Sequence, residues 1–123
     1  MSNEPTYGHG KICYIEVPSS NIARSAAFFS TVFNWQIRTR DDGSVSFDDG
    51  IGGVSGVWRL GLKPSMSAEM LISIMVDDAA ATLELITANG GKVVESIGRH
   101  LPEITARFTD PTGNLWGIYQ HRG

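Results

Sequence analysis

An internal repeat limits the folds open to this chain more than any other feature of the sequence. Val17-Pro18-Ser19 matches Val76-Asp77-Asp78 at an offset of 59 residues (76 − 17). Asp49-Gly50-Ile51-Gly52 matches Asp110-Pro111-Thr112-Gly113 at an offset of 61 (110 − 49). Each half of the chain has the pattern of one strand, one helix and three further strands, so we expect an α+β fold built from two βαβββ modules.

The first module is predicted from strand alternation and helical spacing. Lys11 to Val17 alternates and is rich in β-branched residues, which indicates a strand that Pro18 ends. Ser19 or Ser20 can cap the helix that follows. The apolar stripe of this helix falls at Ile22, Ala26, Phe29 and Phe33. The other strands of the module are expected at Trp35–Arg40, Ser44–Phe47 and Gly52–Leu60.

The second module repeats this order. Met70 to Val76 indicates a strand, and Asp77 or Asp78 is expected to cap a helix that Asn89-Gly90-Gly91 closes. One face of that helix carries Ala79, Leu83 and Ile86. The remaining strands are expected at Lys92–Ile97, Glu103–Thr109 and Asn114–Gln120. We therefore expect a single domain over 1–123, with module one at about 11–60, a linker at about 61–69 and module two at about 70–120.

The last two strands are joined by Asp110-Pro111-Thr112-Gly113, which has the residue preferences of a type I turn. Asn114 follows the turn, and this D-P-x-G-N hairpin near a C-terminus resembles the vicinal oxygen chelate superfamily, the glyoxalase/bleomycin resistance/dioxygenase group. The paired βαβββ modules are similar to the architecture of the same group. The resemblance covers residues 11–120 and implies a curved mixed sheet around a ligand cavity.

Strand alternation predicts which side chains face that cavity. Cys13, Ile15 and Val17 are the apolar set of the first strand and should lie under the helix, so that Tyr14 and Glu16 face the other way. The same reasoning places Trp116 and Ile118 under the second helix. The predicted cavity residues are Tyr14, Glu16, Val54, Gly56, Trp58, Ser73, Met75, Arg107, Leu115, Gly117 and Tyr119. This mixture of aromatic, polar and charged residues is typical of a pocket.

Enzymes of the resembled family place one metal ligand early in the first strand of each module and one late in the fourth. Carried over residue by residue, these positions fall on Ile12, Leu71, Gly56 and Gly117. None of these residues has a side chain that binds a metal ion, so we expect no metal and no other cofactor. His9, His100 and His121 lie in terminal or loop segments, where exposure to solvent is the simpler explanation.

Glu16 allows two interpretations. In some members of the resembled family this position contacts the polar end of the substrate. Alternatively, Glu16 reaches water or pairs with Arg107.

Composition excludes several classes of partner. The net charge of −3 and the absence of a Lys/Arg cluster argue against nucleic acid. No apolar run approaches the roughly 20 residues that a membrane span needs. The single cysteine, Cys13, is consistent with the reducing cytoplasm.

Three functions remain open at this stage. The first is a metal-free protein that binds a small organic molecule in an aromatic-lined cavity, as a homodimer. The second is an enzyme of the glyoxalase, epimerase or lyase kind with an unusual metal-ligand set such as His9 and His121. The third is an interaction module without a ligand.

Overall fold

The computed structural model describes residues 7–121 and consists of two compact units, one up to Lys63 and one from Pro64 on. Both units are βαβββ modules, in agreement with the repeat in the sequence. Unit one contains β1 (Tyr14–Pro18), α1 (Ile22–Phe33), β2 (Gln36–Thr39), β3 (Val45–Asp48) and β4 (Ser55–Arg59). Unit two contains β5 (Ser73–Val76), α2 (Ala79–Ala88), β6 (Lys92–Glu95), β7 (Ile104–Thr109) and β8 (Leu115–Gln120).

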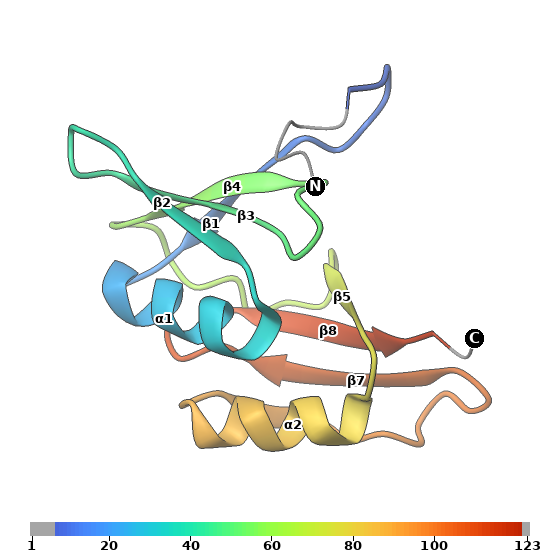
Figure 1. The fold of residues 1–123 in the computed structure, drawn as a ribbon. Coiled ribbons are helices and arrows are strands. Elements are labelled where there is room, and N and C mark those ends of the chain that lie inside the picture. The colour runs from blue at the N-terminus through green and yellow to red at the C-terminus, as the bar shows by residue number, and fades with distance from the viewer. Residues whose placement is uncertain (1–6, 122–123) are drawn as a thin grey trace. The chain divides into compact units, whose positions relative to one another are not determined.

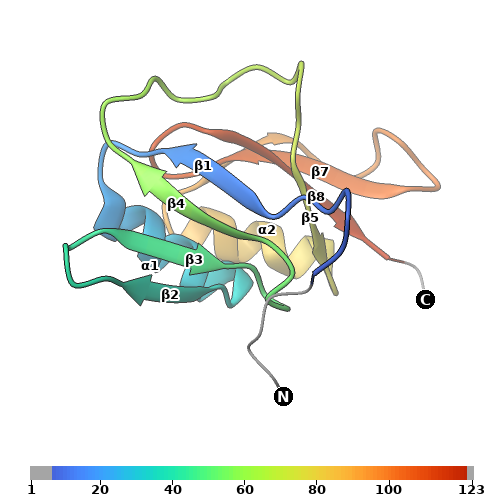
Figure 2. The same cartoon turned by 90° about the horizontal axis from the view of Figure 1, so that it is seen from above.

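Each unit has its own mixed sheet of four strands, and the two sheets have the same topology. The strand order is β1-β4-β3-β2 in unit one (Figures 1 and 2) and β5-β8-β7-β6 in unit two. In each sheet the first strand is parallel to the fourth, while the other pairs are antiparallel. The fold is therefore α+β, as predicted, and neither sheet closes on itself in the described part of the chain.

The helices begin at short polar side chains that accept hydrogen bonds from the first turn. Asp78 caps α2, as expected, by accepting from the backbone N–H of Ala81. The cap of α1 is Asn21, which accepts from Arg24, and not Ser19 or Ser20 as predicted. Ser19 is instead buried, where its hydroxyl accepts from the Asn21 N–H and hydrogen-bonds the hydroxyl of Ser25. No helix in the described range 7–121 is long and apolar enough to cross a membrane.

Aromatic rings fill the core of unit one between α1 and one sheet face. Phe29 stacks on Trp35 with ring centroids 4.5 Å apart, and Trp35 stacks on Phe47 at 4.7 Å. Gly56 lies beside this cluster, and a Cβ atom there would come within 2.3 Å of the Phe47 ring. The glycine is thus needed because the aromatic packing leaves no space for a side chain.

Both first strands are shorter than predicted. β1 starts at Tyr14 and β5 at Ser73, so the segments from Lys11 and Met70 that precede them are not strand. Cys13 was expected to be buried under the helix, but it is exposed and lies in the segment before β1. The stripe of α1 is buried at Phe29 and Phe33, as predicted.

The hairpin between β7 and β8 is organised by the carboxylate of Asp110, which is only 3% exposed. One carboxylate oxygen accepts from the backbone N–H groups of Thr112 (3.1 Å) and Asn114 (3.0 Å). The other accepts from the Asn114 side-chain amide and from the Trp116 indole, both at 3.0 Å. Asp110 therefore ties the turn to a ring of the core.

We expect Asp110→Ala to destabilise the protein by about 2–4 kcal/mol, because it removes the acceptor of several buried donors at once. Asp49→Ala is the matched control, since Asp49 holds the corresponding turn of unit one through one backbone N–H, that of Gly53. Chemical denaturation of both variants measures the difference. Equal losses of unfolding free energy would contradict this role of Asp110.

Candidate functional site

All six predicted cavity residues of unit two face the same way. Ser73 lies opposite Gly117 and Met75 opposite Tyr119 in the parallel pair, and Arg107 lies opposite Gly117 in the antiparallel pair. Leu115 is on the same face, because it precedes Gly117 by two residues. The buried residues Phe108, Trp116 and Ile118 alternate with these and form the core under α2. The open face of this sheet therefore carries the side chains that alternation predicted.

A β-bulge brings Glu95 to this face. Val93 pairs with Phe108 and Glu95 pairs with Arg107, so Val94 is an extra residue in β6. Without the bulge, Glu95 would lie opposite Ala106, which is buried in the core. The bulge thus turns the carboxylate of Glu95 away from the core and towards Arg107.

Glu95 lies at the centre of a charged cluster, in which its carboxylate pairs with two arginines and one histidine. Its Oε2 atom is 3.1 Å from Nε of Arg107, and its Oε1 atom is 3.5 Å from Nε of Arg99. Nε2 of His100 is 3.4 Å from the same Oε1. Glu95 is the most buried member of the cluster, and it holds the loop after β6 against β7.

This cluster borders an open pocket of about 540 Å³. Such a volume is in the range of small-molecule sites. The charged residues of its lining are Glu95, Arg99 and Arg107, and the others are Val94, Ser96, Ile97 and Leu115. Alternation had identified only Arg107 and Leu115. It missed Glu95 because the bulge has no mark in the sequence, and it missed the loop residues because loops have no periodicity.

Unit one places its predicted residues on two different faces. Val17 lies opposite Trp58 and Glu16 lies opposite Val57 in the parallel pair, so Glu16 and Trp58 are on opposite sides of the sheet. Trp58 is 2% exposed and its ring is 4.6 Å from that of Phe47, within the core. The prediction that Trp58 and Gly56 line a cavity with Tyr14 and Glu16 is therefore wrong.

The reason is one additional residue in the turn before β4. In unit two the N–H of Asp110 bonds the carbonyl of Asn114, four residues on. In unit one the N–H of Asp49 bonds the carbonyl of Val54, five residues on. The extra residue shifts the following strand by one position, and a shift of one position moves every side chain to the other face. Val54 itself belongs to this turn and precedes β4.

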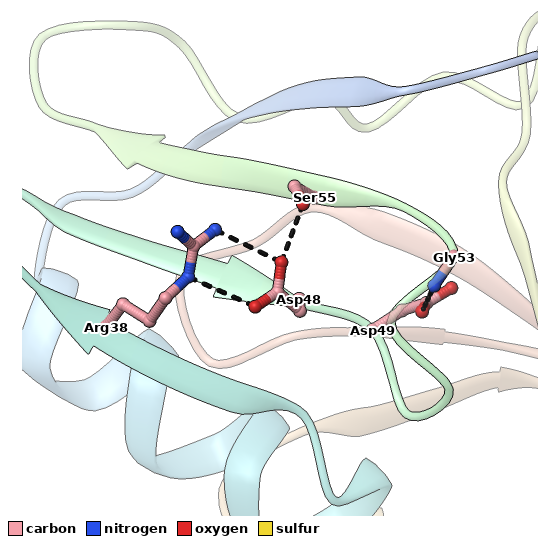
Figure 3. A network of polar contacts seen from close by, with 5 residues as sticks. All are labelled: Arg38, Asp48, Asp49, Gly53 and Ser55. Atoms are coloured by element: carbon pink, nitrogen blue, oxygen red, sulfur yellow. Dashed lines mark hydrogen bonds and ion pairs between the residues drawn. The ribbon is translucent and has the colours of Figure 1, made fainter. Parts of the chain in front are cut away.

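The open face of unit one carries two polar arrangements. Glu16 pairs with Arg59, and this hydrogen bond raises the pKa of Arg59. The expected alternative partner, Arg107, is paired with Glu95 instead. Asp48 accepts from the Ser55 hydroxyl at 2.6 Å and pairs with Arg38, whose Nε atom is 3.0 Å from Oδ2 (Figure 3). Both arrangements are substantially open to solvent.

The register also corrects one of the four positions at which family enzymes hold a metal. Val57 lies opposite Ser46 as Gly117 lies opposite Arg107, so Val57, at an offset of 60 (117 − 57), and not Gly56, corresponds to Gly117. The side chain of Val57 offers no metal ligand. A Cβ atom at Gly117 would come within 2.7 Å of the Ser73 hydroxyl.

The residues at the four positions where family enzymes hold a metal do not fit such a metal centre. Ile12 and Leu71 offer only apolar side chains, and Ile12 is 72% exposed. Within residues 7–121 no group of three or more His, Cys, Asp or Glu side chains could hold a metal ion. Of the three histidines, His100 joins the Glu95 cluster, whereas the ring of His121 lies 6.4 Å from that of Tyr119.

Comparison with known proteins agrees with this architecture. Residues 11–118 match the model of the Glyoxalase/Bleomycin resistance protein/Dioxygenase superfamily. A glyoxylase-like domain-containing protein of Didymella fabae is 32% identical, over 94% of this chain and 97% of its own length.

Solved structures share the fold at low sequence identity. A glyoxalase/bleomycin resistance protein/dioxygenase family enzyme from Burkholderia phytofirmans PsJN superimposes with a TM-score of 0.75 at 16% identity, covering 90% of this chain and 98% of that one. Hypothetical protein SA1046 from S. aureus gives 0.75 at 15% identity, covering 94% and 96%. With its two βαβββ units and this match over nearly its whole length, the chain belongs to the glyoxalase/bleomycin resistance protein/dioxygenase superfamily.

Proposed function

We propose that this protein binds a small organic molecule on the open sheet face of unit two, without a metal at the positions that family enzymes use. The observation that supports this most is the pocket of about 540 Å³ beside Glu95. It joins apolar surface with a few convergent charged groups, a combination that favours recognition of small molecules. Sequestration, carriage or sensing are the functions that such a site serves directly.

The sheet face extends the proposed binding surface beyond the pocket. Ser73, Gly117 and Tyr119 share the face with Arg107 and Leu115. Tyr119 offers a flat ring with a hydroxyl that can donate or accept a hydrogen bond. In unit one, Tyr14 and Glu16 remain proposed contacts on the open face, whereas Trp58 and Gly56 belong to the core.

The proposed setting is the cytoplasm. Cys13 is an exposed free thiol, which a reducing compartment would keep unoxidised. The fold alone does not assign a reaction, since one fold carries many chemistries. The proposal therefore concerns binding.

A fragment titration of the 15N-labelled full chain tests the site. We expect hits to shift the amide signals of Glu95, Arg107 and Leu115 together, since these residues border one pocket. Val94→Ser should weaken such hits about fivefold by removing apolar surface worth roughly 1 kcal/mol. Leu85→Ser is the control, because both residues are exposed apolar side chains of unit two (59% and 44%) but only Val94 lines the pocket. Hits that map away from this face would refute the proposal.

Metal analysis separates this proposal from a metal-dependent enzyme. We expect protein purified without chelator to contain far less than one zinc or nickel ion per chain, because Ile12, Val57, Leu71 and Gly117 offer no suitable set of ligands. Elemental analysis by mass spectrometry measures the content. About one tightly bound ion per chain, lost in His9→Ala or His121→Ala, would support the enzyme instead.

We also propose that the protein is a homodimer. β1 and β2 are the outer strands of the first sheet, as β5 and β6 are of the second, and exposed strand edges need to be covered. Sedimentation velocity at micromolar concentration should give twice the mass of the chain. A single species with the mass of one chain would contradict this expectation.

A further inference from the structure

The pocket of unit two holds more positive than negative charge. Arg99 and Arg107 contribute two guanidinium groups and Glu95 one carboxylate, which leaves a net charge of +1 (2 − 1) in the lining. His100 adds a further positive charge whenever it is protonated. The chain as a whole is negative, at −3, so this excess is local. A local excess of positive charge in a concave site favours anions.

The geometry of the ion pairs leaves donors for a second carboxylate. Both arginines approach Glu95 through Nε, at 3.1 Å for Arg107 and 3.5 Å for Arg99. Within residues 7–121, no protein group accepts a hydrogen bond from the terminal amino groups of Arg99 or Arg107. A guanidinium has five N–H donors and binds carboxylates in a two-point manner, so each arginine can hold Glu95 and a ligand at once.

The remainder of the lining is suited to a hydrocarbon group. Val94, Ile97 and Leu115 present apolar side chains beside the arginines, and Val94 and Ile97 are exposed. A fully polar anion would leave this surface in water. A ligand that has a carboxylate at one end and an apolar body would cover both kinds of surface.

We infer that the pocket binds an organic monocarboxylate, with its carboxylate at Arg107 and Arg99 and its apolar part against Val94, Ile97 and Leu115. The inference rests on the proposed function, since it names the chemical class of ligand for the same pocket. Glu95 then has a definite effect on binding: it positions both arginines, and it competes with the ligand for their positive charge.

Three probes of nearly the same shape test the charge preference. They are 3-phenylpropionate, 3-phenylpropionamide and 3-phenylpropylamine, titrated into the 15N-labelled full chain. We expect the acid to shift the signals of Glu95, Arg107 and Leu115 and to bind at least tenfold more tightly than the amide. The amine should bind more weakly still, because the net charge of the lining repels it.

Three variants test which residues are responsible. Arg107→Gln should weaken the acid about tenfold or more and change the amide little, whereas Arg24→Gln, an exposed position on α1, should change neither. If Arg107→Gln fails to fold, Arg99→Gln, a change in an exposed loop, tests the same loss of affinity for the acid. Glu95→Gln should strengthen binding of the acid several-fold, because it removes the competing charge and keeps a side-chain oxygen. A purely structural Glu95 would instead weaken the acid and the amide alike.

Several outcomes would overturn the inference, and they are distinct from failure of the proposed function. The preference for anions is refuted if the amide binds as tightly as the acid. It is also refuted if the amine binds most tightly and its binding is lost in the Glu95→Gln variant. Both outcomes would still show that the pocket binds a ligand. No shift with any of the three probes also refutes the inference, while the fragment titration decides separately whether the pocket binds other molecules. Acid shifts that map only to residues outside the pocket refute it as well.

Discussion

Strand alternation is the constraint on which every assignment in this protein depends. A side chain in a sheet faces either the core or the open side, and the choice reverses with each residue. Two irregularities of a single residue decide the outcome here. Because the turn between Asp49 and Val54 is longer, the side chain of Trp58 faces the core of unit one. Because of the bulge at Val94, the side chain of Glu95 faces away from the core of unit two.

The two irregularities have opposite consequences for the surface. In unit one the ring of Trp58 completes the aromatic core, and its Nε1–H has no hydrogen-bond acceptor in the described part of the chain. The packing of the ring has to offset the cost of that unpaired donor. In unit two the bulge adds a carboxylate to the open face, where Arg107 and Arg99 neutralise it. Glu95, Arg99 and Arg107 are the charged residues that line the pocket.

The four positions at which family enzymes hold a metal carry no metal-binding side chain in this chain. The fourth strands offer Val57 and Gly117 at the corresponding places, and neither has a side chain that binds a metal ion. The space beside Gly117 is taken by the hydroxyl of Ser73 and the side chain of Leu71. A single substitution at Gly117 would therefore not restore a ligand, since the neighbours would have to move as well. The fold is therefore retained in a chain whose residues at these positions do not form the ligand set of the family enzymes.

The sequence by itself determined the architecture, because that information is periodic or local. The repeat, the stripe at Phe29 and Phe33, the Asp78 cap and the turn at Asp110 each depend on residues close together in the chain. In unit two it also determined the open face at Ser73, Met75, Gly117 and Tyr119, since no irregularity interrupts β5 or β8.

Only the tertiary structure decided the rest, because it depends on register between strands distant in sequence. An offset taken from the matching Asp-Gly and Asp-Pro turns gave Gly56 the place that belongs to Val57, since no sequence rule counts the residues that close a turn. The cluster of Glu95, Arg99, His100 and Arg107 likewise forms only when β6 pairs with β7 around a bulge. One residue of register, which carries almost no signal in the sequence, separates a core position from a position on the open sheet face.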